Sequence, residues 1–158
     1  MLFRSAIKWP NDLLCGGRKL CGILTEASLC AENAEVNYAV VGTGINVNLH
    51  RSAMPEEIAE KATSVLIETG KTHSRAEVAA AYAAHFAELL AVPFSVLMEE
   101  YRAALIVGTR VRVLQGGIPE DGEAYFRGVD EEGRALIDYA DGTRVLSSGE
   151  IEQVTVNG

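Results

Sequence analysis

Residues 38–49 read YAVVGTGINVNL, and they alternate strictly between the two faces of an expected β-strand. One face carries the residues expected to turn to a hydrophobic core: Ala39, Val41, Thr43, Ile45, Val47 and Leu49. The other face carries Tyr38, Val40, Gly42, Gly44, Asn46 and Asn48. Because Gly42 and Gly44 remove bulk and two amides follow, this second face suits the close approach of a polar ligand. A β-bulge at the glycines is the alternative explanation.

The residues before this strand predict a short strand, a turn and a longer strand. Residues 6–9 form an extended run, and Pro10 biases Trp9 toward β geometry. Pro10-Asn11-Asp12 has the chemistry of a turn. Gly16-Gly17 marks another turn before an expected strand at 19–28. Residues 5–50 are therefore expected to form the sheet.

Residues 53–106 have the period of three helices. Pro55 suits the first turn of the first helix and Gly70 its C-terminal cap. One face between them carries Ile58, Ala62, Val65 and Thr69. Ser74 and Glu77 form a capping-box pattern that begins the second helix, which Pro93 ends. The second helix has its apolar side at Val78, Tyr82, His85, Phe86 and Leu89, and the third has Phe94, Leu97, Tyr101 and Leu105.

The last fifty residues change to short strands separated by turns. The expected strands are 111–114, 124–129, 134–139, 144–146 and 153–156. Short strands at this spacing favour a small SH3-like barrel. The chain is therefore expected to be α+β, with one domain at 1–107 and a barrel domain at 108–158.

Composition excludes several classes of protein. The net charge is −8 and the pI about 4.9, so nucleic acid is not an expected partner. No apolar run is long enough to cross a membrane, and residues 1–7 do not have the pattern of a signal peptide. The three cysteines are odd in number and lack metal-site spacing with the histidines. We therefore expect a cytoplasmic protein with reduced thiols and no protein-bound metal.

Residues 8–12, Lys-Trp-Pro-Asn-Asp, place several binding groups around one turn. The segment offers a cation, a stacking plane, an amide and a carboxylate at the end of a strand, where ligands commonly bind. A plain turn with Trp9 packed in the core is the alternative. Lys19 begins the next expected strand, and two lysines from neighbouring elements could converge on an anion; a solvated lysine is the alternative. Gly42-Thr43-Gly44 is not a dinucleotide fingerprint, because the third glycine and the following helix are missing.

Three segments in order resemble consecutive motifs of the biotin–protein ligase family. They are Lys8–Asp12, residues 19–26 (KLCGILTE) and residues 42–48 (GTGINVN). The expected barrel, including Gly149-Glu150-Ile151, is similar to the small C-terminal domain of the same family. The resemblance implies a class II synthetase-like catalytic domain with a partial mixed sheet and helices on one face, followed by the barrel.

The resemblance also implies a reaction and a set of site residues. Ligases of this family join biotin to ATP, with Mg²⁺, and then pass biotin to a lysine of a biotin carboxyl carrier protein, usually of acetyl-CoA carboxylase. Lys19 would be the catalytic cation between the biotin carboxylate and the α-phosphate. The implied biotin-binding residues are Lys19, Gly22, Leu24 and Gly42. The implied nucleotide-binding residues are Lys8, Trp9, Asn11, Asp12 and Asn46, with Asp12 favouring Mg²⁺ or the surrounding polar network and Gly44 leaving room.

The sequence departs from the family pattern at its beginning. The family's Gly- and Arg-rich loop for biotin and phosphate lies well upstream of Lys8–Asp12, whereas this chain begins seven residues before that motif. Gly16-Gly17-Arg18-Lys19 lacks the repeated Gly-Arg pattern and does not replace the loop. We therefore expect a fragment, a truncated reading frame or one piece of a split enzyme, with an exposed sheet edge and self-association as a homodimer. The alternatives are a non-catalytic binding module and a lipoate ligase or octanoyltransferase.

Overall fold

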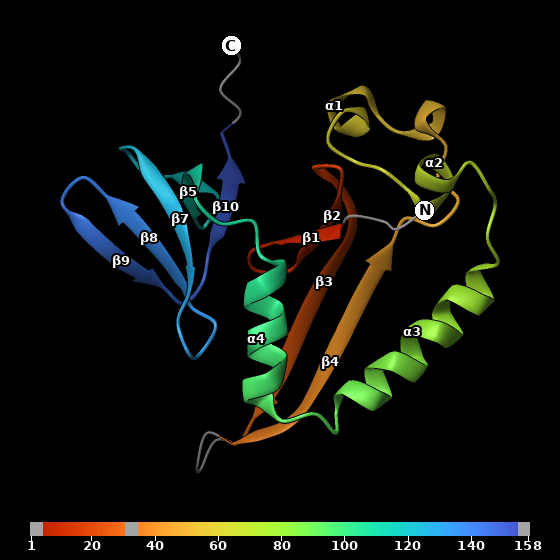
Figure 1. Cartoon of the computed structure of the whole chain (residues 1–158), viewed down its shortest axis with the longest axis horizontal. Coiled ribbons are helices and arrows are strands. Elements are labelled where there is room, and N and C mark those ends of the chain that lie inside the picture. The colour runs from red at the N-terminus through yellow and green to blue at the C-terminus, as the bar shows by residue number, and fades with distance from the viewer. Residues whose placement is uncertain (1–4, 31–34, 155–158) are drawn as a thin grey trace. The chain divides into compact units, whose positions relative to one another are not determined.

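The computed structural model describes residues 5–30 and 35–154, which form two compact units (Figure 1). The first unit contains Ser5 and Asn11–Ala79, and the second contains Ala6–Pro10 and the chain from Ala80 onward. Strand β1 (Ser5–Lys8), which the sequence predicts, therefore lies mostly in the second unit. Helices and antiparallel sheets both occur, so the α+β prediction is confirmed. The domain boundary at 107/108 stays a prediction.

The first unit has three consecutive antiparallel strands: β2 (Asp12–Cys15), β3 (Arg18–Leu29) and β4 (Val36–Ile45). Gly16 and Gly17, with φ of 56° and 77°, make the tight turn between β2 and β3 that the sequence predicts. Figure 1 shows β3 and β4 as two long neighbouring strands. Their register pairs Gly22 with Gly44 and Leu24 with Gly42. The ladder therefore places three glycines close together in the sheet.

Strand β4 differs from the prediction in its end and in its buried face. The strand ends at Ile45 rather than at residue 49, because the chain beyond it bonds to residues from Thr63 onward. Val47 is buried as predicted, but the expected core residues Ala39 and Val41 are exposed. Among the described strands β4 pairs with β3 alone, so its outer edge carries free backbone groups. The prediction of a continuous core face is wrong for this half of the strand.

The single helix predicted between Pro55 and Gly70 is wrong. The chain instead forms a short 3-10 turn η1 (Arg51–Ala53) and two short helices, α1 (Glu56–Ala59) and α2 (Val65–Thr69). Ser64 separates the helices because its backbone is extended and its hydroxyl accepts a hydrogen bond from the Ile67 N–H at 3.1 Å. The same hydroxyl donates to the Leu49 carbonyl at 2.7 Å. The Gly70 cap is confirmed, with φ of 70°.

Replacing Ser64 by alanine should destabilise the protein, because one hydroxyl makes both hydrogen bonds and is fully buried. The expected loss in the free energy of unfolding is about 1–3 kcal/mol. Urea unfolding would measure it. Ser74→Ala is the matched control, because Ser74 accepts one longer bond of 3.3 Å from the Glu77 N–H at an exposed helix start. Equal losses in the two variants would contradict the role assigned to Ser64.

Helix α3 (Arg75–Leu89) crosses the division between the units, and α4 (Phe94–Ala104) lies in the second. The predicted beginning at Ser74 and the break at Pro93 are both confirmed. Tyr82 and Phe86 stack with ring centroids 5.9 Å apart. No residue of α3 is buried, however, so its apolar stripe is not a core face within the described chain. None of the helices in the described part of the chain has the length and hydropathy to cross a membrane.

The second unit is built on an antiparallel sheet with its own core. Its strands are β5 (Thr109–Gln115), β6 (Ile118–Pro119), β7 (Ala124–Val129), β8 (Ala135–Tyr139), β9 (Gly142–Leu146) and β10 (Glu150–Gln153). Their order is β10-β5-β7-β8-β9, with β6 paired to β5. The first four predicted strands are confirmed, whereas the last lies at 150–153, and residues 155 and 156 of its prediction lie outside the described residues. The core includes Trp9, Met98 of α4 and the inward residues of the sheet, among them Phe126, Ile137 and Ile151.

Candidate functional site

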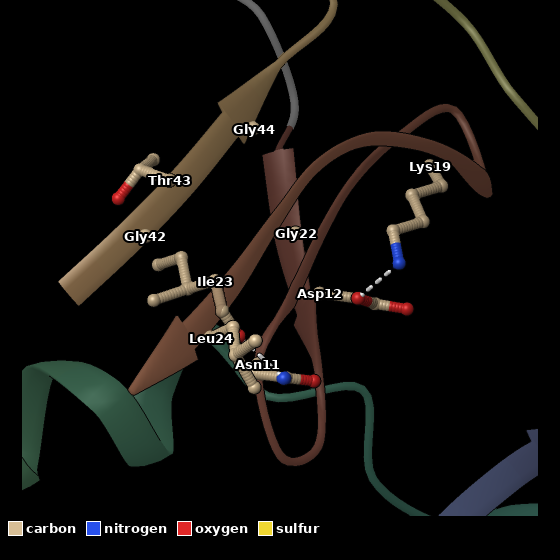
Figure 2. A pocket seen from close by; sticks show the side chains of 9 residues that line it. All are labelled: Asn11, Asp12, Lys19, Gly22, Ile23, Leu24, Gly42, Thr43 and Gly44. Atoms are coloured by element: carbon tan, nitrogen blue, oxygen red, sulfur yellow. Dashed lines mark hydrogen bonds and ion pairs between the residues drawn. The ribbon is translucent and has the colours of Figure 1, made fainter. Parts of the chain in front are cut away.

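The first unit has a shallow pocket of about 460 Å³ where β2, β3 and β4 lie side by side (Figure 2). We call it the glycine pocket. Its lining residues are Asn11, Asp12, Lys19, Gly22, Ile23, Leu24, Gly42, Thr43 and Gly44. All of them belong to the first unit. The pocket therefore combines one cation, one carboxylate and one amide with the three strand glycines.

Lys19 and Asp12 form an ion pair in the glycine pocket. The Lys19 ammonium nitrogen lies 2.6 Å from Asp12 Oδ1 (Figure 2). The Asp12 side chain is 10% exposed, whereas that of Lys19 is 48% exposed. Lys19 thus compensates a nearly buried carboxylate and still presents its charge to solvent. A ligand that enters the pocket meets the ammonium group.

Gly22 leaves the space that this ion pair occupies. Asp12 and Gly22 are partners in the β2–β3 ladder. A Cβ added at Gly22 would lie 3.0 Å from Lys19 Cε, 3.1 Å from Lys19 Nζ and 3.4 Å from Asp12 Oδ1. At Gly42 and Gly44 the nearest atoms would be main-chain oxygens at 3.6 and 3.8 Å, which is ordinary contact. Gly22 is therefore the glycine that the Lys19–Asp12 geometry requires.

Asn11 is held at the pocket by two main-chain contacts with one residue of β3. Its side-chain Nδ2 donates to the Ile23 carbonyl. The Ile23 N–H in turn donates to the Asn11 carbonyl at 3.0 Å. Because Asn11 precedes β2 directly, these bonds hold the entry to the strand that carries Asp12. The side-chain amide of Asn11 is thus held through its nitrogen, and none of these bonds uses its oxygen, Oδ1.

The backbone of Lys19 is bonded to the extended segment between α1 and α2. The Lys19 N–H donates to the Lys61 carbonyl at 2.8 Å, and the Thr63 N–H donates to the Lys19 carbonyl at 2.9 Å. Asn46 supports this segment, because its side-chain Nδ2 donates to the Thr63 carbonyl at 3.0 Å. Asn46 does not line the glycine pocket. Its amide nitrogen therefore supports the backbone around Lys19.

Glu68 joins Arg18 and Thr63 through one carboxylate oxygen. Glu68 Oε1 lies 2.8 Å from Arg18 Nη2 and accepts a hydrogen bond from the Thr63 hydroxyl. The Thr63 hydrogen bond, together with Arg18, lowers the pKa of Glu68 below its ordinary value of about 4.5, against the effect of burial. Burial is also the main cause that raises the pKa of the nearby Cys15 thiol, followed by the charge of Glu68. The sequence carried no signal for this cluster.

The lowered pKa of Glu68 predicts a contribution to acid stability. Since the folded-state pKa lies below about 4.5, the ionised group stabilises the fold above that pH, and this stabilisation is lost as pH falls through the folded-state value. Glu68→Gln should therefore make the free energy of unfolding fall less steeply below about pH 5. Urea unfolding at several pH values would measure the slope. Glu57→Gln, which removes a charge at an exposed position of α1, is the control, and a slope in Glu68→Gln equal to wild type would contradict the prediction.

The predicted site residues divide between the two units. Six of them line the glycine pocket: Asn11, Asp12, Lys19, Gly22, Leu24 and Gly42. Lys8 and Trp9 lie in the second unit and do not line it. Trp9 is 4% exposed, and its Nε1 donates to the Gly133 carbonyl at 3.0 Å, which matches the packing alternative. Sequence reasoning missed the pocket residues Ile23 and Thr43, which have ordinary strand chemistry.

The site's residues do not form a protein-held metal site. Within residues 5–30 and 35–154, no group of three or more His, Cys, Asp and Glu side chains could hold a metal ion. Asp12 is the carboxylate of the glycine pocket, and Lys19 contacts it. Cys15, Cys21 and Cys30 are free thiols, and burial raises the pKa of Cys21. In the glycine pocket, the Asp12 carboxylate is therefore already paired with an ammonium group.

Comparison with known families matches both ends of the chain. Residues 4–46, which contain most of the pocket-lining strands, match the Biotin/lipoate A/B protein ligase family. Residues 106–153, which contain the sheet of the second unit, match the Biotin protein ligase C terminal domain. The two matches occur in the same order as the motifs in the sequence. The chain belongs to the biotin–protein ligase family.

Relatives of known sequence extend across almost the whole chain. The bifunctional ligase/repressor BirA of Bacillus subtilis is 33% identical over 153 residues, which is 92% of this chain and 45% of that protein. The biotin–[acetyl-CoA-carboxylase] ligase of Mycobacterium tuberculosis is 34% identical over 154 residues, 93% of this chain and 52% of that protein. The chain thus spans about half the length of these relatives.

Solved structures of the family have the same fold. The apo biotin protein ligase of Aquifex aeolicus matches with a TM-score of 0.78 and 27% identity, covering 95% of this chain and 66% of that one. The same ligase in complex with biotin and ATP matches with a TM-score of 0.71 and 29% identity, covering 94% of this chain and 61% of that one. The prediction of a ligase-like α+β domain followed by a small β-domain is confirmed.

Proposed function

We propose that this chain supplies the wall of a biotin–protein ligase site that faces biotinyl-5′-adenylate. The observation that carries the proposal is the Lys19–Asp12 pair in a pocket that three strand glycines help to line. The reaction is proposed from the name of the Mycobacterium tuberculosis relative, a biotin–[acetyl-CoA-carboxylase] ligase. The ligands are proposed from the Aquifex aeolicus structure, which is a complex with biotin and ATP. Biotin and ATP are the proposed substrates of this site.

In the first proposed step, a carboxylate oxygen of biotin attacks the α-phosphorus of ATP, and pyrophosphate leaves. Both reactants are anions, and negative charge increases on the phosphoryl oxygens in the transition state. The ammonium of Lys19 lowers the energy of that state by contacting the carboxylate and the phosphate. Asp12 directs this ammonium, and Gly22 leaves the room for it. Lys19 is therefore the proposed catalytic residue.

In the second step, a lysine amine of the carrier attacks the carbonyl carbon of the mixed anhydride. An amide forms, AMP leaves, and the amine loses its proton. The proposed partner is a biotin carboxyl carrier protein of an acetyl-CoA carboxylase. Leu24, Gly22 and Gly42 are proposed to contact the biotin side of the adenylate. Asn11 and Asp12 are proposed to contact the nucleotide side.

Three other predicted nucleotide contacts fit this proposal less well. Trp9 is buried in the second unit, so we assign it to packing of that core; Asn46 donates to the Thr63 carbonyl, so we assign it to support of the backbone around Lys19. Lys8 lies outside the glycine pocket and stays a prediction. Mg²⁺ does not fit as a protein-held ion here, because the carboxylate of Asp12 is engaged by Lys19. We therefore propose no residue of this chain as a metal ligand in the reaction.

The test uses two proteins: the chain alone and a chimera in which the chain replaces the matching region of the Bacillus subtilis relative. Each is mixed with ATP, Mg²⁺, a biotin carboxyl carrier domain and either biotin or lipoate. Biotin on the carrier from either protein, without lipoate transfer, is the expected result. No biotin transfer from both proteins, or equal transfer of lipoate, would overturn the proposal. The match to the Biotin protein ligase C terminal domain favours biotin over lipoate.

Self-association through the sheet of the first unit is also proposed. Several apolar side chains of β3 and β4 are exposed: Leu24, Leu29, Val36, Tyr38 and Val40. An exposed strand edge beside apolar side chains favours pairing with another chain. Sedimentation of the chain should show a homodimer that dissociates on dilution. A monomer at all concentrations would contradict this expectation.

A further inference from the structure

The backbone of Lys19 is held by a polar network that does not itself reach the glycine pocket. The network consists of Arg18, Thr63 and Glu68, and all three lie in the first unit. Glu68 Oε1 binds Arg18 Nη2 at 2.8 Å and accepts from the Thr63 hydroxyl. None of the three residues lines the glycine pocket. A direct contact with the adenylate is therefore not their role.

The network closes a ring around one residue. Arg18 precedes Lys19 in the chain, and the Thr63 N–H donates to the Lys19 carbonyl at 2.9 Å. Glu68 then joins the two sides of this contact through Arg18 and Thr63. Lys19 is thus flanked by a covalent bond on one side and a hydrogen bond on the other, and one carboxylate anchors both neighbours.

Two side chains of the network, Thr63 and Glu68, are largely buried, whereas the Arg18 side chain is 32% exposed. Thr63 is fully buried, and the Glu68 side chain is 17% exposed. A buried hydroxyl that loses its acceptor becomes costly, so the Thr63 side chain cannot turn away without penalty. A lysine side chain has four flexible bonds, so the position of its ammonium depends on how firmly its Cα is held. A displacement of about 1 Å in a catalytic group can cost on the order of 100-fold in rate.

We propose that Thr63 and Glu68 are positioning residues for Lys19, because their hydrogen bonds fix the backbone from which the ammonium of Lys19 reaches the pocket. This inference rests on the proposed function. Asn46 assists from the other side of the same segment, through its bond to the Thr63 carbonyl. The network acts through Lys19 and makes no contact of its own with substrate.

The test measures the biotin-dependent exchange of pyrophosphate into ATP. It uses either the chain alone or the chimera with the Bacillus subtilis relative, whichever transfers biotin. Thr63→Val removes the hydroxyl and keeps the shape, and it should lower kcat by about tenfold or more while KM for ATP changes less than threefold. Thr63→Ser keeps the hydroxyl and should retain kcat within about threefold. Glu68→Gln should lower kcat in the same way as Thr63→Val.

Ser64→Ala is the control for a purely structural effect. Ser64 is the buried neighbour of Thr63, but its hydroxyl, which the substitution removes, bonds to Leu49 and Ile67 and to no side chain of the network. The Ser64→Ala variant should have a lower free energy of unfolding but the wild-type kcat. If Thr63→Val keeps wild-type kcat while Lys19→Ala loses it, the positioning role is wrong and the proposed function stands. If Ser64→Ala loses as much kcat as Thr63→Val, the effect is general destabilisation and the inference also fails. Absence of biotin transfer from both wild-type proteins would overturn the proposed function itself.

Discussion

Replacing Lys19 by alanine is expected to lower biotinyl-adenylate formation by about 100-fold or more. The reason is that the ammonium is the cation of the glycine pocket, whereas the reacting carboxylate and phosphate are both negative. The variant should still fold, because the main-chain hydrogen bonds of residue 19 are retained, but it should lose some stability because the nearly buried Asp12 carboxylate loses its cation. Pyrophosphate release in the active protein, with biotin and ATP saturating, would measure the effect.

Two further variants sharpen the Lys19 result. Lys61→Ala removes a lysine whose main chain contacts Lys19 but whose side chain is outside the pocket, and it should keep the wild-type rate. Lys19→Arg keeps the charge but not the shape, because a planar guanidinium cannot replace a compact ammonium beside Gly22. It should recover only part of the lost rate. Release of pyrophosphate by Lys19→Ala at the wild-type rate would remove Lys19 from the mechanism.

Replacing Gly22 by alanine should have the second largest effect, with adenylate formation reduced by about tenfold or more. The added methyl group would lie 3.0 Å from Lys19 Cε and 3.1 Å from Lys19 Nζ, so the ammonium must move from its position beside Asp12. Strand geometry tolerates alanine at this position, and the backbone itself should not resist the change. Pyrophosphate release and the melting temperature, measured together, would separate the loss of rate from a loss of folding.

Gly44→Ala is the matched comparison for Gly22→Ala. It adds the same methyl group to the partner residue in the β3–β4 ladder, but the nearest atom is the Gly22 carbonyl oxygen at 3.8 Å. The Lys19–Asp12 pair should therefore keep its geometry, and the loss of rate should be smaller than for Gly22→Ala. An equal loss in the two variants would mean that space for the ligand, rather than for the ion pair, decides the effect.

Much of the fold could be predicted from local signals. Gly16-Gly17 marks the hairpin because both residues need positive φ, and Ser74 and Pro93 mark helix ends. The break before α2 could not be predicted, because Ala62 and Val65 continue a helical period on either side of it. What breaks the helix is tertiary: the Ser64 hydroxyl donates to the Leu49 carbonyl.

Site residues that belong to a sequence motif could be predicted, whereas residues that only tertiary contacts bring to the site could not. Asn11, Asp12 and Lys19 stand out because polar groups cluster around a proline turn and a strand start. The structure brings them together with the strand glycines. Thr63 and Glu68 give no sequence signal, because a threonine between two helices and a glutamate on a short helix are both ordinary. Their importance arises only when the chain folds back onto Arg18 and Lys19.

The same limit applies to the aromatic ring of the Lys8–Asp12 motif. As a sequence, Trp9 offers a stacking plane, but the structure buries it in the core of the second unit. Its neighbours in the chain, Asn11 and Asp12, line the pocket of the first unit instead. A motif that is continuous in the sequence therefore divides in the structure, with core packing at Trp9 and pocket lining at Asn11 and Asp12.

The burial of Trp9 has a practical consequence for spectroscopy. Trp9 is the one tryptophan of the 158-residue sequence, and its indole N–H is bonded to Gly133 within the second unit. Intrinsic fluorescence excited at the indole band will therefore follow the melting of the β5–β10 sheet and its core. Trp9 is not among the residues that line the glycine pocket, so calorimetry or a labelled nucleotide is the more direct measure of pocket occupancy.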